Sequence, residues 1–470
     1  MKILFIYPNN QKNNWRLPLG ISYLIGILKK YNHNVILYDT TLNGAIDDNL
    51  LYKLKYFQPH LICISIMSTN ITLSTKIISF IKEKFPKLKI LVGGIHATIS
   101  PILLLKNQDI DYLCLGEGEI SLIKFIEEFE NNNYEYYGEI NGIWYKKDGN
   151  IIDRGYSDLE TNLDILPFPD RQIFDTRHNL MISHGTPILT ARGCPFNCSY
   201  CVNPIYKKIY KNNYIRFRSI ENVIEEMREI IFAYNNDSFF IQDETFFMKK
   251  ERVVEFCKIY QKEINIPFRC MGQVTQIDKE ILEILKEAKC EGISIGIESG
   301  NENIRKNILK RDVKNEKIIE IFHYAKKLKI KIHSFNIIGL PLESRKEIDE
   351  TLDLNIKAQP YSVQFTIMTP FEGTEIRKIY ENNNCIIKNY VDSVYGDSMI
   401  KTDKFNSEEL IKIQKIIPYR YYFHNKPILL FLSKLISNLS DKNKIIKIFK
   451  RIIKDYLESK IKYYSRLNYF

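Results

Sequence analysis

Two series of short, β-branched apolar runs, separated by segments of helix length, constrain the fold of this chain more than any other feature. In the first series the runs are Ile3–Tyr7, Val35–Tyr38, Leu61–Ile66, Ile90–Val92 and Tyr112–Leu115. Stretches with apolar residues at helical spacing lie between them, for example Leu19–Tyr31 and Thr72–Phe85. Strands that alternate with helices form parallel sheets, so the first part of the chain is predicted to be a doubly wound, Rossmann-like α/β domain.

The second series begins near residue 185 and contains six candidate strands. These are Ile188–Thr190, Phe239–Ile241, Phe268–Met271, Gly292–Ile297, Lys331–Ile338 and Ser362–Ile367. Helices fit between them, for example Glu221–Tyr234 and Lys279–Ala288. Six βα units are too few for a closed eight-stranded barrel, but they suit a partial, TIM-like (β/α)6 barrel. Its site is expected at the carboxyl ends of the strands.

A hairpin and an extended linker are predicted between the two series. The hairpin combines Gly142–Tyr145, a turn at Asp148–Gly149 and the pair Ile151–Ile152. Pro167 and Pro169 mark the linker that follows. The predicted organisation is a first domain at 1–135, the hairpin and linker at 136–183, the barrel at 184–384 and a helical, basic C-terminal extension at 385–470.

Composition narrows the classes of function. The net charge of +11 is spread along the chain without an aromatic-interleaved basic stripe, which argues against a nucleic-acid partner. The opening run Met1–Pro8 is too short for a signal peptide, and no apolar stretch approaches the roughly 20 residues that a membrane span needs. Nine cysteines, three of them close together, favour a metal site in a reducing compartment, so a cytoplasmic location is expected.

Those three cysteines, Cys194, Cys198 and Cys201, carry the most specific signal in the sequence. Spacings of three and then two residues let one loop wrap one face of a cubane cluster. Four-iron clusters are usually held by four thiolates. Three thiolates leave one iron open, which is useful when the remaining ligand is the amino and carboxylate group of a bound molecule.

Two other interpretations of these cysteines are a structural zinc site and a set of buried thiols. Zinc normally recruits a fourth Cys or His at regular spacing. Cys257, Cys270 and Cys290 each lie in a periodic helix or strand of their own, so they are expected to be core residues.

The Cys-x-x-x-Cys-x-x-Cys motif, placed just after the first strand of a βα series, resembles the radical S-adenosylmethionine (SAM) superfamily. Four further segments that end strands match that resemblance in order: Phe240–Phe246, Gly296–Gly300, Asn336–Pro341 and Thr369–Thr374. Each of them alone would also suit a structural turn. The match of all five in order is difficult to obtain by chance.

The resemblance implies a role for individual residues. Cys194, Cys198 and Cys201 would ligate a 4Fe-4S cluster, Tyr200 would lie against adenine, and Glu244 would hold the methionine ammonium group. The further SAM contacts that it implies are Gly296, Glu298, Ser299, Gly339 and Pro341. For Glu244 the structural alternative is a position beside a helix N-cap, and for Glu298 it is a plain turn.

In the first domain, glycine-rich and polar segments again follow the strands. Ligands of open α/β sheets bind outside the carboxyl ends of the strands, and glycine lets a large flat cofactor approach the backbone. The candidate contacts are Leu19, Gly20, Ser65, Ser68, Gly93, Gly94, His96, Thr98, Gly116, Glu117 and Gly118. With the linker, they resemble the cobalamin-binding radical SAM enzymes, which include C-methyltransferases and the anaerobic magnesium-protoporphyrin ester cyclase. The match covers roughly residues 1–380.

The sequence departs from some cobalamin domains in one respect. The Asp-x-His-x-x-Gly motif, which supplies a histidine below cobalt in methionine synthase-type domains, is absent. His96 stands in a Gly-Gly-x-His context and is not equated with that ligand; it also suits a structural histidine. The alternative for the whole domain is a degenerate Rossmann-like fold that only covers the barrel mouth or binds substrate.

The resemblance implies a radical SAM enzyme that generates a 5′-deoxyadenosyl radical and also binds cobalamin. It would methylate an unactivated carbon in a lipid or secondary metabolite. An acidic flavodoxin or ferredoxin would be the reductant, and anaerobic conditions are expected. A radical cyclase, oxidase or rearrangement enzyme is the main alternative. A sensor would not need the SAM contacts, and tRNA thiomethylases usually have a second cluster in an N-terminal domain, where only Cys63 and Cys114 occur.

The C-terminal extension combines apolar and basic residues. Pro427–Leu432 and Ile445–Phe449 interleave with lysines and Arg451. This pattern suits a basic amphipathic helix on a membrane surface or an acidic partner, and it equally suits a helical cap that packs on the barrel.

Overall fold

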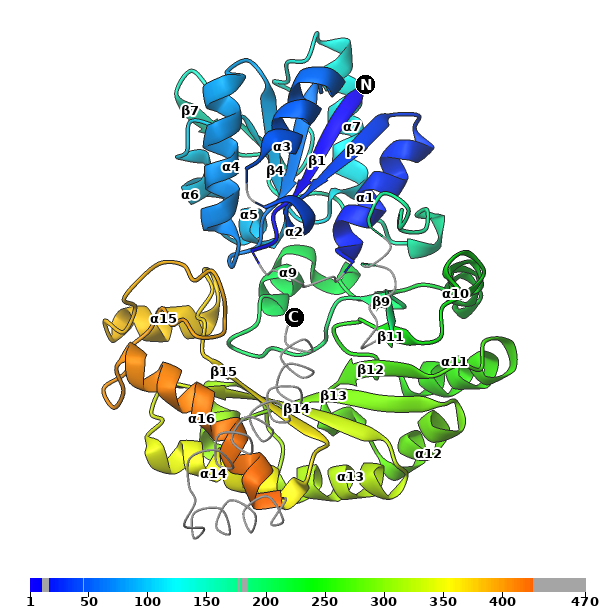
Figure 1. The fold of residues 1–470 in the computed structure, drawn as a ribbon, viewed down its shortest axis with the longest axis vertical. Helices are drawn as coiled ribbons and strands as arrows, with labels where there is room; N and C mark the ends of the chain where they lie inside the picture. Colours follow the sequence, from blue (N-terminus) through cyan, green and yellow to red (C-terminus); the bar gives the residue numbers. More distant parts are fainter. Residues whose placement is uncertain (11–16, 45, 176–177, 179–184, 426–470) are drawn as a thin grey trace, which may run out of the picture.

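The computed structural model describes residues 1–10, 17–44, 46–175, 178 and 185–425. Two α/β domains are stacked one above the other (Figure 1). The N-terminal domain points the carboxyl ends of its parallel strands at the second domain, and helix α9 (Asn203–Tyr210) lies between them. Among the described residues, no helix is long and apolar enough to span a bilayer.

The N-terminal domain is built on a seven-stranded sheet of order β2-β1-β3-β4-β5-β6-β7. Its strands are β1 (Lys2–Tyr7), β2 (Asn34–Asp39), β3 (Leu61–Ser65), β4 (Lys89–Gly93), β5 (Tyr112–Cys114), β6 (Ile143–Lys147) and β7 (Asn150–Ile152). The first five are parallel, and β6 and β7 are antiparallel. The expected alternation of strands and helices is therefore confirmed, with strand limits within one residue of the sequence prediction.

Helices cover both faces of this sheet. The helices are α1 (Leu19–Lys30), α2 (Thr40–Asn43), α3 (Asp48–Tyr52), α4 (Ile71–Lys84), α5 (Ile95–Ile99), α6 (Pro101–Leu105) and α7 (Gly118–Asn131). α1 and α7 pack in one apolar core with the side chains of Phe5 and Cys63. α4 and α6 pack in a second core with Leu4 and Ile62, on the opposite face. Neighbouring residues of a strand thus enter opposite cores, as the pleat of a doubly wound sheet requires.

The predicted hairpin forms as β6 and β7 and adds an antiparallel edge to the first sheet. Its turn residues Asp148 and Gly149 have φ angles of 51° and 79°, the pair of positive values that a two-residue hairpin turn needs. β6 pairs with β5, as in Trp144 opposite Leu113. In the sequence-based organisation the hairpin lay outside the first domain, whereas the structure makes it part of the sheet.

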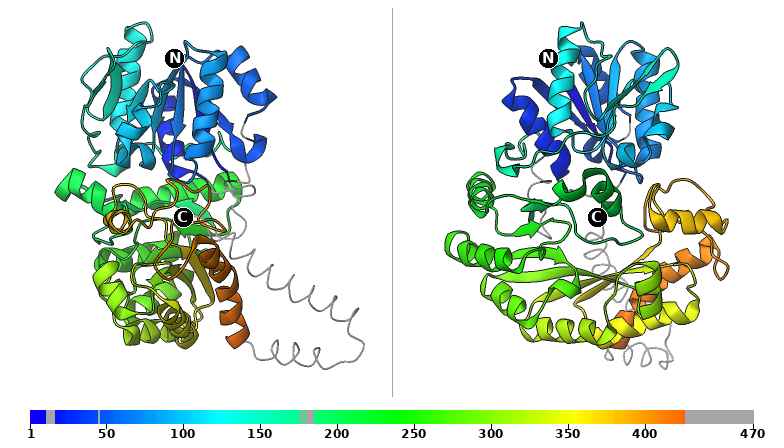
Figure 2. Two further views of the ribbon diagram at one scale, coloured as in Figure 1. Left: turned by 90° about the vertical axis from the view of Figure 1, so that its left-hand side faces the viewer. Right: turned by 180° about the vertical axis from the view of Figure 1, so that it is seen from behind.

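The second domain is a six-stranded, all-parallel partial barrel of order β15-β14-β13-β12-β11-β8 (Figure 2). Its strands are β8 (Thr186–Ile188), β11 (Phe239–Ile241), β12 (Phe268–Gly272), β13 (Cys290–Glu298), β14 (Lys331–Ile338) and β15 (Ser362–Ile367). The outer helices are α10 (Ile220–Tyr234), α11 (Lys250–Glu263), α12 (Lys279–Glu287), α13 (Asn315–Lys327) and α14 (Arg345–Ala358). α15 (Glu375–Asn382) follows β15 and contacts the cysteine loop, where the N–H of Ile376 donates to the carbonyl of Ser199 at 3.0 Å. A short antiparallel pair, β9 (Ala191–Arg192) with β10 (Arg216–Phe217), lies between β8 and α10 in the chain.

The linker between the domains is fixed to both of them. The carboxylate of Asp170 pairs with Lys29 of α1 at 2.6 Å. The next residue, Arg171, pairs with the buried Glu226 of α10 at 2.8 Å and donates to the carbonyl of Pro187 at 2.8 Å. Buried ion pairs constrain geometry even where their net stabilisation is small, so the linker holds the two domains in a defined arrangement.

The C-terminal extension is helical as far as the structure describes it. Helix α16 (Ser407–Asn425) packs against β15 and α14. Its Tyr421 hydroxyl donates to the carbonyl of Pro360 at 2.5 Å, and the side chain of Gln414 donates to the carbonyl of Phe365 at 3.3 Å. This part therefore caps the barrel. The predicted basic amphipathic stretch from Pro427 onward lies outside the described residues.

Candidate functional site

The loop that carries the cysteine triad is fixed to the neighbouring strand by one carboxylate. Asp243, which follows β11, accepts from the backbone N–H of Thr190 at 2.7 Å and of Ala191 at 3.1 Å. The hydroxyl of Thr190 also donates to it, at 2.5 Å. Asp243 is 1% exposed, and burial raises its pKa to about 6 although the hydrogen bonds oppose that shift. The start of the cysteine loop is thereby attached to the second strand of the barrel.

Gly193 is required at the turn into the first cysteine. Its φ angle is +94°, and a Cβ at this position would lie 2.5 Å from the carbonyl oxygen of Tyr214. A residue with a side chain would have to displace backbone as well as adopt an unfavourable conformation. This glycine allows the loop to turn inward.

The three thiols of the triad are largely shielded from solvent. Cys194 and Cys198 are buried and Cys201 is half-buried. Burial raises the pKa of Cys194 to about 12 and also raises the pKa of Cys201. Buried thiols of this kind become thiolates only when a metal neutralises them.

Two side-chain amides lie against the sulfurs. The amide nitrogen of Gln273, just after β12, lies 3.6 Å from the Sγ of Cys198, and that of Asn203 lies 3.5 Å from the Sγ of Cys201. Within the described residues, no three His, Cys, Asp or Glu side chains converge as ligands of a single ion. A four-iron cluster needs no such convergence, because each thiolate binds a different iron.

A buried polar cluster lies beside the triad at the end of β13. The hydroxyl of Tyr200 donates to the carboxylate of Glu298 at 2.9 Å. Arg311 donates to the Tyr200 hydroxyl at 3.2 Å and to the carbonyl of Gly296 at 2.8 Å. Burial raises the pKa of Glu298, although Arg311 and Tyr200 oppose that shift. Three of the predicted SAM residues thus meet here, together with an arginine that no sequence motif pointed to.

The other predicted SAM residues in this part of the barrel lie in the turns that follow β13 and β14. Ser299 is fully buried, and its hydroxyl accepts from the N–H of Asn301 at 3.3 Å, so it supports the turn after β13. Gly339 has a φ of +78°, and its N–H donates at 2.5 Å to Glu343, whose pKa burial raises to about 8. Pro341 is half-buried in the same turn. Sequence reasoning missed Glu343, although its place four residues after Gly339 was visible.

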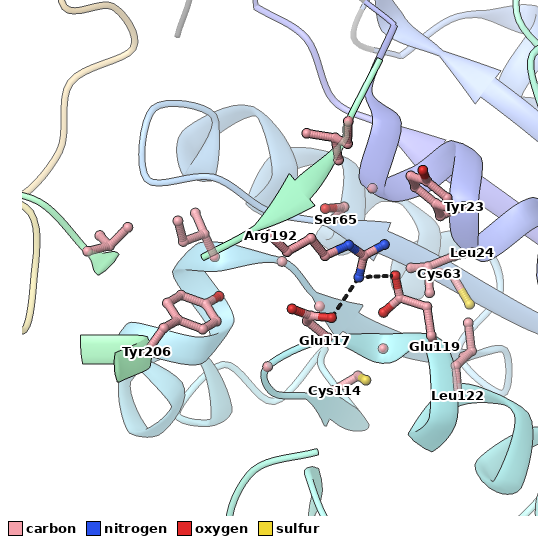
Figure 3. A pocket seen from close by; sticks show the side chains of 18 of the residues that line it. Tyr23, Leu24, Cys63, Ser65, Cys114, Glu117, Glu119, Leu122, Arg192 and Tyr206 are labelled. Atoms are coloured by element: carbon pink, nitrogen blue, oxygen red, sulfur yellow. Dashed lines mark hydrogen bonds and ion pairs between the residues drawn. The ribbon is translucent and has the colours of Figure 1, made fainter. Parts of the chain in front are cut away.

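A cavity of about 450 Å³ lies between the domains (Figure 3). The carboxyl ends of strands and the first turns of helices in the N-terminal domain form one wall, and the cysteine loop, α9 and the segment that follows β11 form the other. The predicted residues that line it are Gly20, Ser65, Gly93, Gly94, Gly116, Glu117, Gly118 and Glu244. The Glu244 side chain is open to this cavity, and burial between the domains raises its pKa to about 7.

Four predicted cobalamin contacts do not line the cavity. Leu19 is buried in the α1 core. Ser68 and the fully buried His96 pair with each other at 2.9 Å outside the lining, and burial lowers the pKa of His96 to about 4. Thr98 accepts from the N–H of Gly116 at 2.9 Å. These four residues therefore lie outside the cavity lining, and Thr98 supports the lining residue Gly116 through its hydrogen bond.

An ionic network crosses the cavity from one domain to the other. Arg192, two residues before Cys194, pairs with Glu117 at 2.6 Å and with Glu119 at 2.7 Å, and its guanidinium lies 5.0 Å from the ring centre of Tyr23 (Figure 3). Arg216 of β10 pairs with Glu117 as well. Burial alone would raise the pKa of Glu117, but the two arginines outweigh it and lower that pKa. Sequence reasoning found only Glu117 of this network.

The cavity extends into the N-terminal domain as an inner arm, defined here by Phe5, Leu24, Cys63, Leu91 and Leu122. Phe5 of β1 is in register with Cys63 of β3, which is in register with Leu91 of β4, so the three side chains form a row across the sheet. Leu24 of α1 and Leu122 of α7 lie opposite this row.

Glycine opens the mouth of this arm. A Cβ on Gly20 would project into empty space, whereas one on Gly118 would lie 3.2 Å from Leu24 and 3.5 Å from the sulfur of Cys114. Side chains at these two positions would narrow the entrance between α1 and α7.

Comparisons with known proteins agree with this geometry. The chain matches the model described as the B12 binding domain over residues 17–125 and that of the radical SAM superfamily over residues 188–354. It therefore belongs to the radical SAM enzymes that carry an N-terminal B12-binding domain. Enzymes of this class use a 4Fe-4S cluster, SAM and cobalamin, and these are the cofactors of this chain.

Two relatives and one solved structure are similar over most of the chain. An uncharacterized methyltransferase of Pyrococcus horikoshii is 26% identical over 91% of this chain and 93% of its own length. The cytidylyl-2-hydroxyethylphosphonate methyltransferase of Streptomyces wedmorensis is 24% identical over 80% of this chain and 79% of its own. The cobalamin-dependent SAM radical enzyme OxsB, solved with aqua-cobalamin and SAM, shares the fold with a TM-score of 0.70 at 17% identity, over 97% of this chain and 70% of OxsB.

Proposed function

We propose that this enzyme transfers a methyl group to an unactivated carbon of a small molecule, in a lipid or secondary metabolite. The observation that carries the proposal is the shared cavity: strand ends of the B12-binding domain form one wall, and the loop of Cys194 forms the other. The two relatives compared above are both named methyltransferases, which favours methylation over the cyclisation named for a similar enzyme of Rubrivivax gelatinosus.

For the cluster, we propose Cys194, Cys198 and Cys201 as ligands. Three enclosed thiols with two amide donors beside them suit an iron–sulfur cluster, because hydrogen bonds to sulfur stabilise its negative charge. The open iron would take the amino and carboxylate groups of SAM. Glu244 suits the methionine ammonium group, since a carboxylate with a pKa raised to about 7 gains most from a nearby cation. Tyr200, Glu298 and Arg311 would bound the nucleoside part of the site.

For cobalamin, we propose the cavity lining of the N-terminal domain as the binding surface. Its contacts would be Gly20, Ser65, Gly93, Gly94, Gly116, Glu117 and Gly118. The glycines bring backbone to the surface of the cavity, which suits a flat macrocycle. The inner arm would hold the lower nucleotide base.

The protein's own contribution to the reaction is position and shielding. When bound, the cofactors supply the radical that removes a hydrogen atom and the methyl group that replaces it. Arg192 holds the cysteine loop against Glu117 and Glu119 and so keeps the two walls in register. The enclosed cavity keeps water away from a reactive intermediate. A flavodoxin- or ferredoxin-type protein in the cytoplasm would deliver the electron.

The test is anaerobic reconstitution followed by turnover with SAM that carries a labelled methyl group. The reconstituted chain should contain about four irons and one corrinoid, form 5′-deoxyadenosine after reduction, and transfer the label to a candidate substrate. Cys198→Ala should abolish both the cluster absorption and 5′-deoxyadenosine formation, and Cys257→Ala in the barrel core is the matched control. Retention of both signals in Cys198→Ala would refute the ligand assignment, and product without label would refute methylation.

A further inference from the structure

A row of half-buried residues crosses the inner face of the barrel on the neighbouring strands β13, β14 and β15 (Figure 1). Gly296 of β13 is in register with Phe335 of β14, which is in register with Gln364 of β15. The residues on either side of each are at most 4% exposed and pack toward the outer helices. Side chains alternate between the two faces of a strand, so the three residues of the row face the interior of the barrel.

One end of this row belongs to the proposed SAM site. The carbonyl of Gly296 accepts from Arg311 at 2.8 Å, and Arg311 also donates to the hydroxyl of Tyr200. Neighbouring strands lie about 4.8 Å apart, so Gln364 lies roughly 10 Å across the sheet from Gly296. A small molecule that lies over Phe335 would therefore reach both the SAM end of the row and Gln364.

The other end of the row is a polar pair that helix α16 holds in place. The side-chain amide of Gln364 donates to the hydroxyl of Tyr395. The residue after that tyrosine, Gly396, donates its N–H to Gln414 of α16 at 2.9 Å, and the side chain of Gln414 donates to the carbonyl of Phe365 at 3.3 Å. Through Gln414, α16 fastens the loop of Tyr395 to β15, so the position of the Gln364 amide is fixed.

The side-chain oxygen of Gln364 is the part of this pair that is left for a ligand. It is buried and accepts no hydrogen bond from the part of the chain that the structure describes. Because the amide nitrogen is directed at Tyr395, the oxygen is the acceptor that remains. A buried acceptor without a donor is unfavourable, and a ligand that supplies the donor removes that cost.

We propose that Gln364 binds a hydrogen-bond donor of the substrate. The enzyme would thus take small molecules in which an apolar segment separates a hydroxyl or amide N–H group from the carbon that is methylated. The proposal deepens the proposed function and rests on it. Phe335 contacts the apolar segment, and the reacting carbon lies at the SAM end of the row. A molecule that lacks the donor leaves the Gln364 oxygen buried without a partner, which is an effective way to reject it.

The experiment compares p-cresol with 4-fluorotoluene, two probes of nearly equal shape of which only p-cresol carries a hydroxyl donor. Their dissociation constants are measured by ligand-observed NMR titration of the full-length chain, reconstituted anaerobically with its cofactors and SAM. p-Cresol should bind about tenfold more tightly, because 4-fluorotoluene offers nothing to the Gln364 oxygen. Binding of the two probes within twofold of each other, or binding of neither, would refute the proposal.

Three variants assign the preference to this side chain. Gln364→Met removes the acceptor at nearly constant volume and should bring the two dissociation constants within about twofold. Gln364→Glu keeps an oxygen acceptor and should retain the preference for p-cresol, which separates loss of the acceptor from damage to the fold. Gln261→Met makes the first change at an exposed position of α11 and should leave the ratio at the wild-type value. A wild-type ratio in Gln364→Met would contradict the assignment.

Probe binding does not depend on turnover, so this proposal and the proposed function can fail separately. A chain that prefers p-cresol but transfers no labelled methyl group retains the donor site and refutes methylation. A chain that transfers the label but binds both probes equally refutes the donor site and retains methylation.

Discussion

Replacing Arg192 by methionine tests whether the ionic network across the cavity holds the two domains together. The wild-type guanidinium pairs with Glu117 at 2.6 Å and with Glu119 at 2.7 Å. Methionine keeps most of the aliphatic volume and removes the charge. Glu117 retains Arg216 as a partner, whereas Glu119, whose side chain is 7% exposed, loses the cation with which it pairs among the described residues. One buried carboxylate is thus left uncompensated.

The expected loss is about 3 kcal/mol in the free energy of unfolding, the lower end of the range for breaking a buried pair. This corresponds to a factor of roughly 150 in the unfolding equilibrium. The assay is urea unfolding of the cofactor-free chain at pH 7. Arg228→Met is the matched control, because Arg228 pairs with Glu263 at the surface and is 57% exposed, and such pairs contribute under about 1 kcal/mol.

The pH dependence gives a second readout of the same network. The pKa of Glu117 is lowered in the folded chain, so its contribution is present above the unfolded pKa of about 4.3 and is lost as the pH falls through the folded value. The stability difference between wild type and Arg192→Met should therefore shrink in acid. If Arg192→Met destabilises the chain no more than Arg228→Met, the network does not hold the domains as described here.

Three further predictions concern the barrel. Asp243→Leu should lower the iron content after reconstitution by more than about half without unfolding the chain, because it removes the oxygen that accepts from the N–H groups of Thr190 and Ala191; iron analysis and circular dichroism measure this. The free energy of unfolding of Glu343→Gln should rise relative to that of the wild type as the pH rises from 5 to 8. The Glu343 carboxyl has its pKa raised to about 8 in the folded chain, so over this range the unfolded wild type releases a proton that the folded wild type keeps, and the wild type loses stability; urea titrations at both pH values test this. Gln273→Leu should make the midpoint potential of the reconstituted cluster more negative, because it removes an N–H donor from the Cys198 sulfur; a spectroelectrochemical titration that finds no shift would rule this out.

Local pattern predicted the elements well. The strand Lys331–Ile338 and the strand Ser362–Ile367 have the predicted limits, because their β-branched runs end at Gly-rich or polar breaks. The first barrel strand ends two residues earlier than expected, at Ile188. Thr190 there donates its N–H to Asp243 instead of a neighbouring strand. A side chain more than fifty residues away in the sequence decides that boundary.

The candidate site was predictable where one segment carries the signal and not where distant segments meet. The cysteine spacing and the glycines after the strands are local features. Arg192, Arg216 and Arg311 gain their roles from partners that lie 75, 99 and 111 residues away, so no spacing points to them. The glycine pair before His96 predicts a cavity residue, but the buried ring of His96 packs against Tyr390 and lies outside the cavity lining.

Helix α9 sets the distance between the two proposed cofactor sites. It begins two residues after Cys201, and Tyr210 at its other end brings its hydroxyl to where a Cβ of Gly116 would be. Eight helical residues make a rigid spacer of about 12 Å, since each adds about 1.5 Å. The length of this one short helix thus determines the spacing between the cysteine loop and the opposite domain. Adding or removing a single residue there would rotate one end against the other by about 100° and change the separation of the two proposed sites.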